Sequence, residues 1–323
     1  MRRHLITTAT TLVATALLGS ALAGCGGSTA GGGGSKSVIA LLPQGNDQPY
    51  GAVYVKTMQA RAKELGIKLE LTNSKYDAAT QSSQCDVAVA KKPSAIILWP
   101  ADARAVRPCL LKAKAANIPV DSSNSDVLAA DKSLVHAYSG PSNDQVGRLD
   151  ADLLSKGMNG KGNIIVVLGQ PGNSTAIDRF NGFKDQLAKK HPGIKILGSQ
   201  PANWDKAQAI TATSELVTRF GTRIDGVYAQ DDTMAAGVVE ALKNRGVDPA
   251  SKIIVGCGNT KLGQANVKSG DQYGTLFQSP VWDGRHAVDL AADVIDGKKV
   301  EADTFMPMPE VTKANVSKYP AEW

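Results

Sequence analysis

The chain has 323 residues, which is long enough for two ordinary domains. Its composition, 42% hydrophobic and 20% charged residues, is that of a soluble globular protein able to bury a sizeable core. The formal net charge is +6, but the basic residues are scattered, and Arg2 and Arg3 lie in a segment that we expect to be removed. The charge pattern therefore argues against nucleic-acid binding.

The N-terminus has the organisation of an export signal. A basic start at Met1 to Arg3 precedes an uncharged, Ala-rich run over residues 5–22, which is too weakly apolar to predict a membrane span. The run ends in Leu-Ala-Gly-Cys at residues 22–25, which resembles the lipobox of bacterial lipoproteins, where the Cys thiol receives a diacylglycerol. This resemblance implies that residues 1–24 are a signal peptide and that Cys25 is lipidated. The alternative is ordinary signal cleavage beside an unrelated Cys.

A Gly- and Ser-rich segment follows Cys25. Residues 26–35 read G-G-S-T-A-G-G-G-G-S and have no capacity to pack, so residues 25–36 are predicted to form a lipidated Cys and a flexible tether. A lipid anchor, a tether and a globular body together predict a protein held at the extracytoplasmic face of the cell membrane, with the lipid as its only membrane contact.

From residue 37 the hydrophobic pattern alternates between strands and helices. The expected strands cover residues 38–42, 67–71, 95–98, 118–120, 134–138, 164–168, 194–198, 227–229, 253–255 and 274–278. The expected helices cover residues 53–65, 78–90, 103–116, 144–156, 175–190, 206–220, 233–242, 262–267 and 281–295. This alternation predicts an α/β protein with parallel sheets and helices on both faces. The units are more than one open sheet usually holds, so two doubly wound lobes with a cleft between them are expected.

Cys85 and Cys109 each lie about two turns into consecutive expected helices. Such helices run side by side in a doubly wound sheet, so the two sulfurs would lie at equal height, and a disulfide is permitted outside the cell. The alternative is two unrelated buried thiols. Cys257 follows an apolar run and is expected to be a buried small residue rather than a nucleophile.

Two adjacent acids stand where the strand at residues 227–229 gives way to a helix. One carboxylate at this position can cap the first helical turn. The other can accept hydrogen bonds from a ligand, because ligands of open α/β sheets bind outside the carboxyl ends of the strands. We expect Asp232 to cap the helix and Asp231 to face a ligand.

Several stretches, taken in order, resemble the ribose-binding-protein-type (type I) periplasmic solute-binding proteins. They are I-A-L-L-P-Q-G-N-D-Q-P-Y (39–50), A-N-I-P-V (116–120), N-S-T-A-I-D-R-F-N-G-F (173–183), S-Q-P-A-N-W-D (199–205), V-Y-A-Q-D-D-T-M-A-A-G (227–237) and T-L-F-Q-S-P (275–280). The resemblance covers roughly residues 37–313. It implies one lobe of residues 37–141 plus 279–306, a second lobe of residues 142–278 plus 307–323, and a three-strand hinge near Ser142, Gln278 and Met306-Pro307.

The resemblance also implies a sugar site between the lobes. The residues at matching positions are Gln48, Tyr50, Asn124, Ser125, Trp204, Asp231 and Gln278. A flat indole at Trp204 can cover the C–H face of a sugar, although core packing is the alternative. Gln278 matches a contact to a sugar hydroxyl, with a solvated loop residue as its alternative.

The departures from the family pattern concern charged residues. The family's Asp-Arg pair is Asn124-Ser125 here, its second sugar-binding Arg falls on Ile177 with Arg179 two residues on, and the Asp of a later loop falls on Gly258, before Asn259. A pocket without these charges should not bind ribose as the family's namesake does. A neutral polyol, a deoxy or modified sugar, or a different pentose fits better.

The implied function is that of an extracytoplasmic substrate-binding lipoprotein, expected to be a monomer without a cofactor, that closes on its ligand and delivers it to an ABC permease and ATPase complex. A ligand-sensing lipoprotein of the chemoreceptor or autoinducer type is the alternative. An enzyme is not supported, because His136, His191 and His286 show no metal-ligand spacing and no nucleophile or phosphate-loop motif follows a strand.

Overall fold

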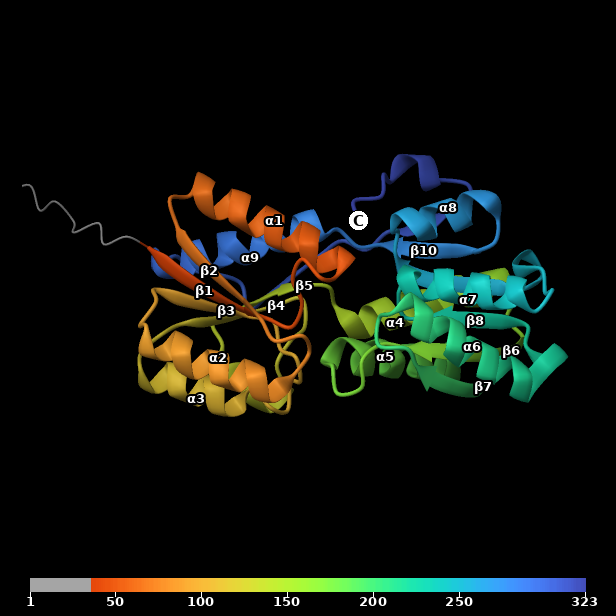
Figure 1. The fold of residues 1–323 in the computed structure, drawn as a ribbon, viewed down its shortest axis with the longest axis horizontal. Helices are drawn as coiled ribbons and strands as arrows, with labels where there is room; N and C mark the ends of the chain where they lie inside the picture. Colours follow the sequence, from red (N-terminus) through yellow and green to blue (C-terminus); the bar gives the residue numbers. More distant parts are fainter. Residues whose placement is uncertain (1–35) are drawn as a thin grey trace, which may run out of the picture. The chain divides into compact units, whose positions relative to one another are not determined.

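Two six-stranded sheets carry the fold in the computed structural model, which describes residues 36–323 (Figure 1). The predicted signal peptide, Cys25 and the tether through Ser35 lie outside the described residues. The described residues belong to one compact unit. Every strand pairing is parallel except that between β10 and β12. The prediction of an α/β fold with two doubly wound lobes is confirmed.

The first sheet has the strand order β11-β5-β4-β3-β1-β2. Its strands are β1 (Ser37–Leu42), β2 (Lys68–Asn73), β3 (Ala95–Leu98), β4 (Val120–Ser123), β5 (Tyr138–Gly140) and β11 (Asp303–Phe305). The helices packed on it are α1 (Pro49–Glu64), α2 (Ala78–Ala90), α3 (Arg107–Ala115) and α9 (Pro280–Ile295). This sheet with its helices is called lobe 1.

The second sheet has the order β12-β10-β9-β8-β6-β7. Its strands are β6 (Gly162–Leu168), β7 (Ile194–Pro201), β8 (Gly226–Ala229), β9 (Ile253–Gly258), β10 (Gly274–Phe277) and β12 (Glu310–Thr312). Its helices are α4 (Asn143–Gly157), α5 (Ser174–Lys190), α6 (Lys206–Phe220), α7 (Asp232–Asn244) and α8 (Lys261–Ser269). These elements form lobe 2.

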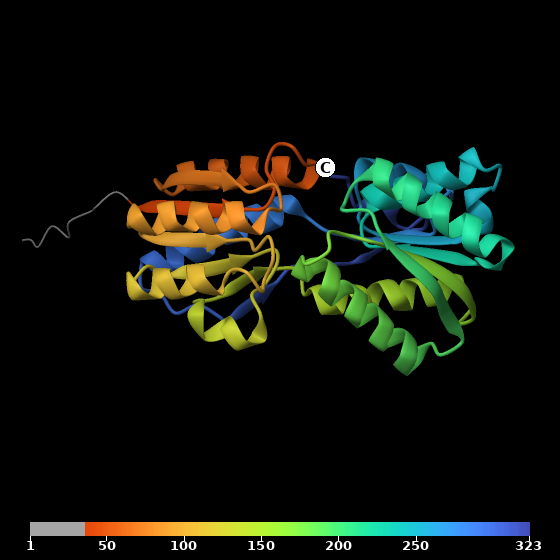
Figure 2. The same cartoon turned by 60° about the horizontal axis from the view of Figure 1, so that its bottom comes forward.

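Helices cover both faces of each sheet. Successive side chains of a strand point to opposite faces, so both sets are buried. In β1, Val38, Ala40 and Leu42 pack under α1 and α9, whereas Ile39 and Leu41 pack against α2 and α3. In lobe 2, α4 and α5 cover one face of the sheet and α6 and α7 cover the other (Figure 2). This double burial explains why the strands read as continuous apolar runs rather than alternating ones.

Three chain segments cross between the lobes: β5 to α4, β10 to α9, and β11 to β12. These crossings contain Ser142, Gln278 and Met306-Pro307, the positions that the family resemblance implied. The two lobes are therefore joined by three chain segments.

Some element boundaries differ from the predictions. Residues 134–138 were expected to be a strand, but residues Ala129–Leu134 form a 3₁₀ helix and β5 begins only at Tyr138. Helix α1 begins at Pro49 rather than residue 53, because the fixed φ of proline suits the first helical turn. Strands β11 and β12 were not predicted, since three-residue strands give too short a pattern to read.

Cys85 on α2 and Cys109 on α3 lie within bonding distance, with their Cα atoms 5.8 Å apart. The neighbouring arrangement of these helices, on one face of the first sheet, is the one that the sequence predicted. Cys257 lies in β9 and is buried and unpaired. Over residues 36–323, no helix combines the length and apolar character that a membrane crossing requires.

Candidate functional site

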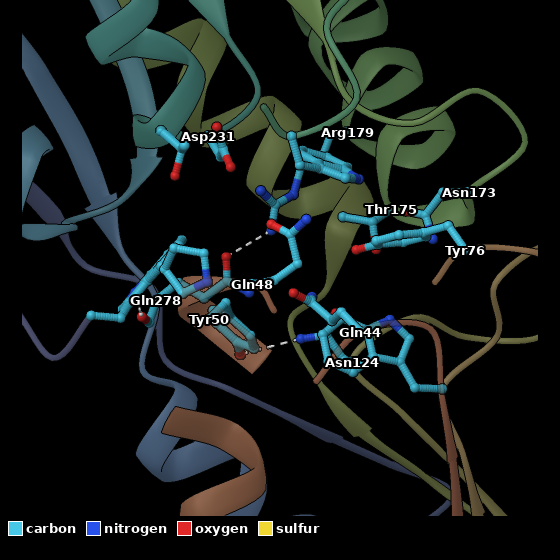
Figure 3. Close-up of a pocket in the computed structure, with 15 residues that line it drawn as sticks. Gln44, Gln48, Tyr50, Tyr76, Asn124, Asn173, Thr175, Arg179, Asp231 and Gln278 are labelled. Carbon is cyan, nitrogen blue, oxygen red and sulfur yellow. Dashed lines mark hydrogen bonds between the residues drawn. The ribbon is translucent and has the colours of Figure 1, made fainter. Parts of the chain in front are cut away.

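A pocket draws residues from both lobes at the carboxyl ends of their strands (Figure 3). The empty space among its lining residues is ≈ 500 Å³, a volume that includes open solvent. Lobe 1 and the hinge provide Gln44, Gln48, Pro49, Tyr50, Tyr76, Trp99, Asn124 and Gln278. Lobe 2 and the C-terminal segment provide Asn173, Thr175, Arg179, Trp204, Asp231, Thr233 and Trp323.

The structure brings the predicted residues together, with one exception. Ser125 does not line the pocket, because its hydroxyl is turned into the protein, where it accepts a hydrogen bond from Trp99 Nε1 at 3.2 Å and meets Thr175 Oγ1 of lobe 2. Its hydroxyl thus makes a contact between the lobes. Ligand binding by the other residues stays a prediction.

Tyr50, Asn124 and Asp283 form a hydrogen-bonded group in lobe 1. The Tyr50 hydroxyl donates to Asp283 Oδ2 at 2.6 Å, and Asn124 Nδ2 donates to the same oxygen at 2.6 Å and to Tyr50 Oη at 3.2 Å. Asp283 is fully buried in the first turn of α9 and does not line the pocket. Burial raises the pKa of Asp283 to about 7, and the two donors oppose that rise. Asp283 thus orients Tyr50 and Asn124 through hydrogen bonds, although it is not itself a pocket residue.

The Trp204 ring lies between the pocket and the core of lobe 2. Its indole packs so closely on the chain that a Cβ at Gly169 would approach Trp204 Cζ2 to 2.1 Å. It also contacts the apolar cluster between β6, α6 and α7. Its Nε1 is buried without a hydrogen-bond partner among residues 36–323. Trp204 is thus part of both the pocket and the core packing, so neither of the two interpretations excludes the other.

Arg179 on α5 is a pocket residue that the sequence prediction left out. The side chain is buried and donates to Asn143 Oδ1 at 3.1 Å, to the Gln230 carbonyl at 2.8 Å and to Gln278 Oε1 at 2.8 Å. The family resemblance pointed instead to Ile177, which is 42% exposed. Helical periodicity could have identified Arg179, because it lies one turn after Thr175 on the same face, whereas Ile177 is rotated away.

Gln278 is buried rather than solvated, which excludes the alternative of an exposed loop residue. Its side-chain oxygen accepts from Arg179, and its backbone carbonyl accepts from Trp323 Nε1 at 3.2 Å. It therefore lies at the hinge as a fixed part of the pocket wall.

The expected roles of the two adjacent acids need correction. Asp231, not Asp232, caps α7, because its Oδ1 accepts from the Met234 amide at 2.7 Å. Asp232 is fully buried below the pocket, where it accepts from Gln272 Nε2 at 2.7 Å and Thr275 Oγ1 at 2.8 Å. The first residue of the pair has the extended backbone of a helix cap, and the second already belongs to the helix.

Asp231 nevertheless lines the pocket, so capping and facing a ligand fall on one residue. Burial raises the pKa of Asp231 to about 7, with the Met234 amide opposing and the Asp232 carboxylate adding to the rise. A buried carboxylate in a pocket is a strong acceptor for hydroxyl donors once it is ionised.

Three comparisons agree on the class of protein. A model of the periplasmic binding protein domain matches residues 39–299. The xylitol-binding protein of Mycolicibacterium smegmatis is 32% identical over 259 residues, 80% of this chain and 72% of that protein. The ribose import binding protein of Haemophilus influenzae is 29% identical over 270 residues, 83% of this chain and 89% of that protein.

Among solved structures, an ABC transporter solute binding protein from Bacillus halodurans with bound myo-inositol superposes with a TM-score of 0.82. It is 25% identical, and the match covers 89% of this chain and 98% of that one. The chain therefore belongs to the type I periplasmic binding proteins, a family of extracytoplasmic solute-binding proteins.

This membership confirms the expectation that the chain is a binding protein and not an enzyme, because its relatives are substrate-binding proteins. Among residues 36–323, no cluster of His, Cys, Asp or Glu is suited to a metal ion.

Proposed function

We propose that the protein is the substrate-binding lipoprotein of an ABC importer and that it binds a neutral monosaccharide or sugar alcohol between its lobes. The observation that carries the proposal is the lining of the pocket, where aromatic rings stand beside amides and two groups of opposite charge, the Asp231 carboxylate and the Arg179 guanidinium. Aromatic rings cover the C–H surface of a sugar, and amides and carboxylates pair with its hydroxyls.

The hydrogen bonds inside the protein orient the groups left for a ligand. Asn124 directs its amide nitrogen to Asp283 and Tyr50, which leaves its Oδ1 as an acceptor. Gln278 uses its Oε1 for Arg179, which leaves its amide nitrogen as a donor. Asp231 adds a second acceptor. A hydroxyl can donate and accept, so a polyol satisfies such a mixed set, whereas an anion or a cation would leave groups unpaired.

Contacts between the lobes support binding by hinge closure. Ser174 Oγ of lobe 2 donates to the Asp126 carbonyl of lobe 1 at 3.2 Å, and Asn143 Nδ2 donates to the Asn124 carbonyl at 3.1 Å. The lobes thus touch around the pocket. A ligand that bonds to both walls stabilises this conformation relative to an open one and shifts the population toward it.

The remaining features fit an exported, anchored protein. The lipobox-like segment supports lipidation of Cys25, which predicts that Cys25→Ser moves the protein from the membrane fraction to the soluble one. The Cys85–Cys109 pair supports a disulfide formed outside the cell. The xylitol- and ribose-binding relatives, the second of which is an import protein, favour transport over sensing.

A thermal-shift screen tests the proposed ligand class, because a ligand that binds only the folded state raises Tm. The panel is xylitol, myo-inositol, D-ribose and D-allose, with gluconate and glucosamine as charged counterparts. We expect a rise in Tm with at least one neutral compound and none with the charged pair. Asp231→Asn should reduce the rise, and Asp225→Asn, an exposed acid of the same lobe, should not. A shift only with a charged compound would contradict the proposal.

A further inference from the structure

The last residues of the chain reach the junction of the two lobes. In both ribbon views the C-terminus lies beside the segments that cross between the sheets (Figures 1 and 2). The segment of residues 319–323 follows the short 3₁₀ helix Val316–Lys318 and is called the C-terminal strap. Its last side chain, Trp323, lines the pocket. The family resemblance assigned residues 307–323 to the second lobe but implied no ligand contact from this segment.

Hydrogen bonds hold the strap on lobe 2. The Tyr319 carbonyl accepts from Asn259 Nδ2 at 2.8 Å and from Gln264 Nε2 at 2.8 Å. The main-chain oxygen of Trp323 accepts from the Lys261 amide at 2.7 Å, in the first turn of α8. The backbone on both sides of the strap is thereby fixed, which limits the positions open to the indole.

The same strap also contacts lobe 1 and the hinge. Glu322 Oε2 accepts from Ser279 Oγ at 2.7 Å and from the Val281 amide at 3.3 Å, at the start of α9. The Trp323 ring packs edge-on against Tyr50, with centroids 5.1 Å apart and planes at 89°. A carboxylate at a helix N-terminus and a perpendicular aromatic pair are both favourable contacts. The strap thus connects the two lobes beside the pocket.

The Trp323 indole packs against Gly258, where the absence of a side chain permits a close approach. This residue has φ +130°, and a Cβ there would lie 2.6 Å from Trp323 Cζ2. Trp323 Nε1 is occupied by the Gln278 carbonyl at 3.2 Å. The ring therefore offers a ligand its carbon surface and not its N–H.

We propose that Trp323 is a ligand-contacting residue, positioned by the C-terminal strap, that gives the pocket an apolar wall and connects ligand affinity to lobe closure. The inference rests on the proposed function, since it concerns the same pocket. An opening of the hinge separates Tyr50 from the part of the strap held on lobe 2, so the wall is complete only when the lobes are together. A C–H face of the ligand is the surface that this wall would cover.

The test measures calorimetric affinity for each neutral compound that binds the wild-type protein, beginning with xylitol and myo-inositol. Trp323→Ala should weaken binding by about 10-fold or more, because the apolar wall is lost. The affinity of Trp323→Phe should stay within about 5-fold of the wild-type value, because an aromatic ring remains. Trp282→Ala is the matched control: Trp282 stacks on His286 of α9 and does not line the pocket, so its removal should leave the affinity unchanged.

The outcomes separate this inference from the proposed function. Wild-type protein that binds none of the neutral compounds overturns both. Wild-type binding with a Trp323→Ala affinity within twofold of it overturns the role of Trp323 alone. The Tm measured without ligand reports whether each variant folds. If Trp323→Ala does not fold, Trp323→Leu replaces it, because Leu keeps apolar bulk without a flat ring. Trp323→Leu should also weaken the affinity by about 10-fold, the value of a lost aromatic contact.

Discussion

The pocket walls formed by lobe 1 and lobe 2 differ in the position of their charged side chains. In lobe 1 the carboxylate, Asp283, lies behind the wall, and the pocket meets the ring of Tyr50 and the amide of Asn124. In lobe 2 the charged groups, Arg179 and Asp231, line the pocket themselves. We propose that the charged groups of lobe 2 contribute most to ligand selection, so substitutions of Arg179 and Asp231 should have larger effects on binding than a substitution of Tyr50.

The largest effect is expected for Arg179→Met. The change leaves the acceptors on Asn143, Gln230 and Gln278 unpaired in a buried site, which should lower the free energy of unfolding by about 3 kcal/mol and abolish binding. Urea unfolding and calorimetry measure the two effects. Arg219→Met, on the exposed end of α6, is the control and should be near neutral. Retained binding would show that lobe 2 does not select through Arg179.

Asp231→Asn should weaken binding by about 10–100-fold, the value of a hydrogen bond to a charged group. The fold should tolerate the change, since Asn also caps helices, whereas Asp231→Ala should lose about 1 kcal/mol of stability in addition. Because the pKa of Asp231 is raised to about 7, wild-type affinity should increase as pH rises from 6 to 8 and the Asn variant should show no such increase. Equal pH profiles would exclude ligand binding by this carboxylate.

Asp283→Asn should change the pH dependence of stability rather than that of affinity. A carboxyl whose pKa is raised by burial to about 7 binds its proton more tightly in the folded state, so its contribution to stability is full below the unfolded pKa and is lost as pH rises toward 7. Relative to wild type, the Asn variant should therefore gain stability between pH 4 and 7, by at most about 1.4 kcal/mol per pH unit. A difference that is constant with pH would contradict this.

The smallest effect is expected for Tyr50→Phe. The hydroxyl already donates to Asp283, so affinity should fall by only about 2–5-fold through a less well oriented Asn124. Stability should fall by about 1 kcal/mol for the lost hydrogen bond. A loss of affinity as large as that of Asp231→Asn would remove the distinction between the two walls.

The sequence predicted most of the fold because the strands of both lobes are apolar runs between helices of ordinary length. It missed β11 and β12 and misplaced β5, where the segments are three residues long and pattern carries little information. For the site, it identified the residues that follow strand ends, among them Asn124 and Asp231.

The sequence analysis did not assign Arg179 or Asp283 to the site, because their positions there depend on how the helices pack and not on the local sequence pattern. Arg179 was two positions away from the expected one, and only the orientation of α5 shows that it faces the pocket. Asp283 lies far from Tyr50 in the sequence, yet α9 packs beside α1 and brings them to hydrogen-bond distance.

The sequence alone determined the class of fold and the loops that form the pocket, because these follow from local periodicity and from motifs read along the chain; the export signal stays a prediction. Only the tertiary structure decided which adjacent acid caps α7, that the Ser125 hydroxyl pairs with Trp99 and Thr175, and that Trp323 lines the pocket. Those outcomes depend on how side chains far apart in sequence share space and hydrogen bonds once the sheets, the helices and the C-terminal strap are packed together.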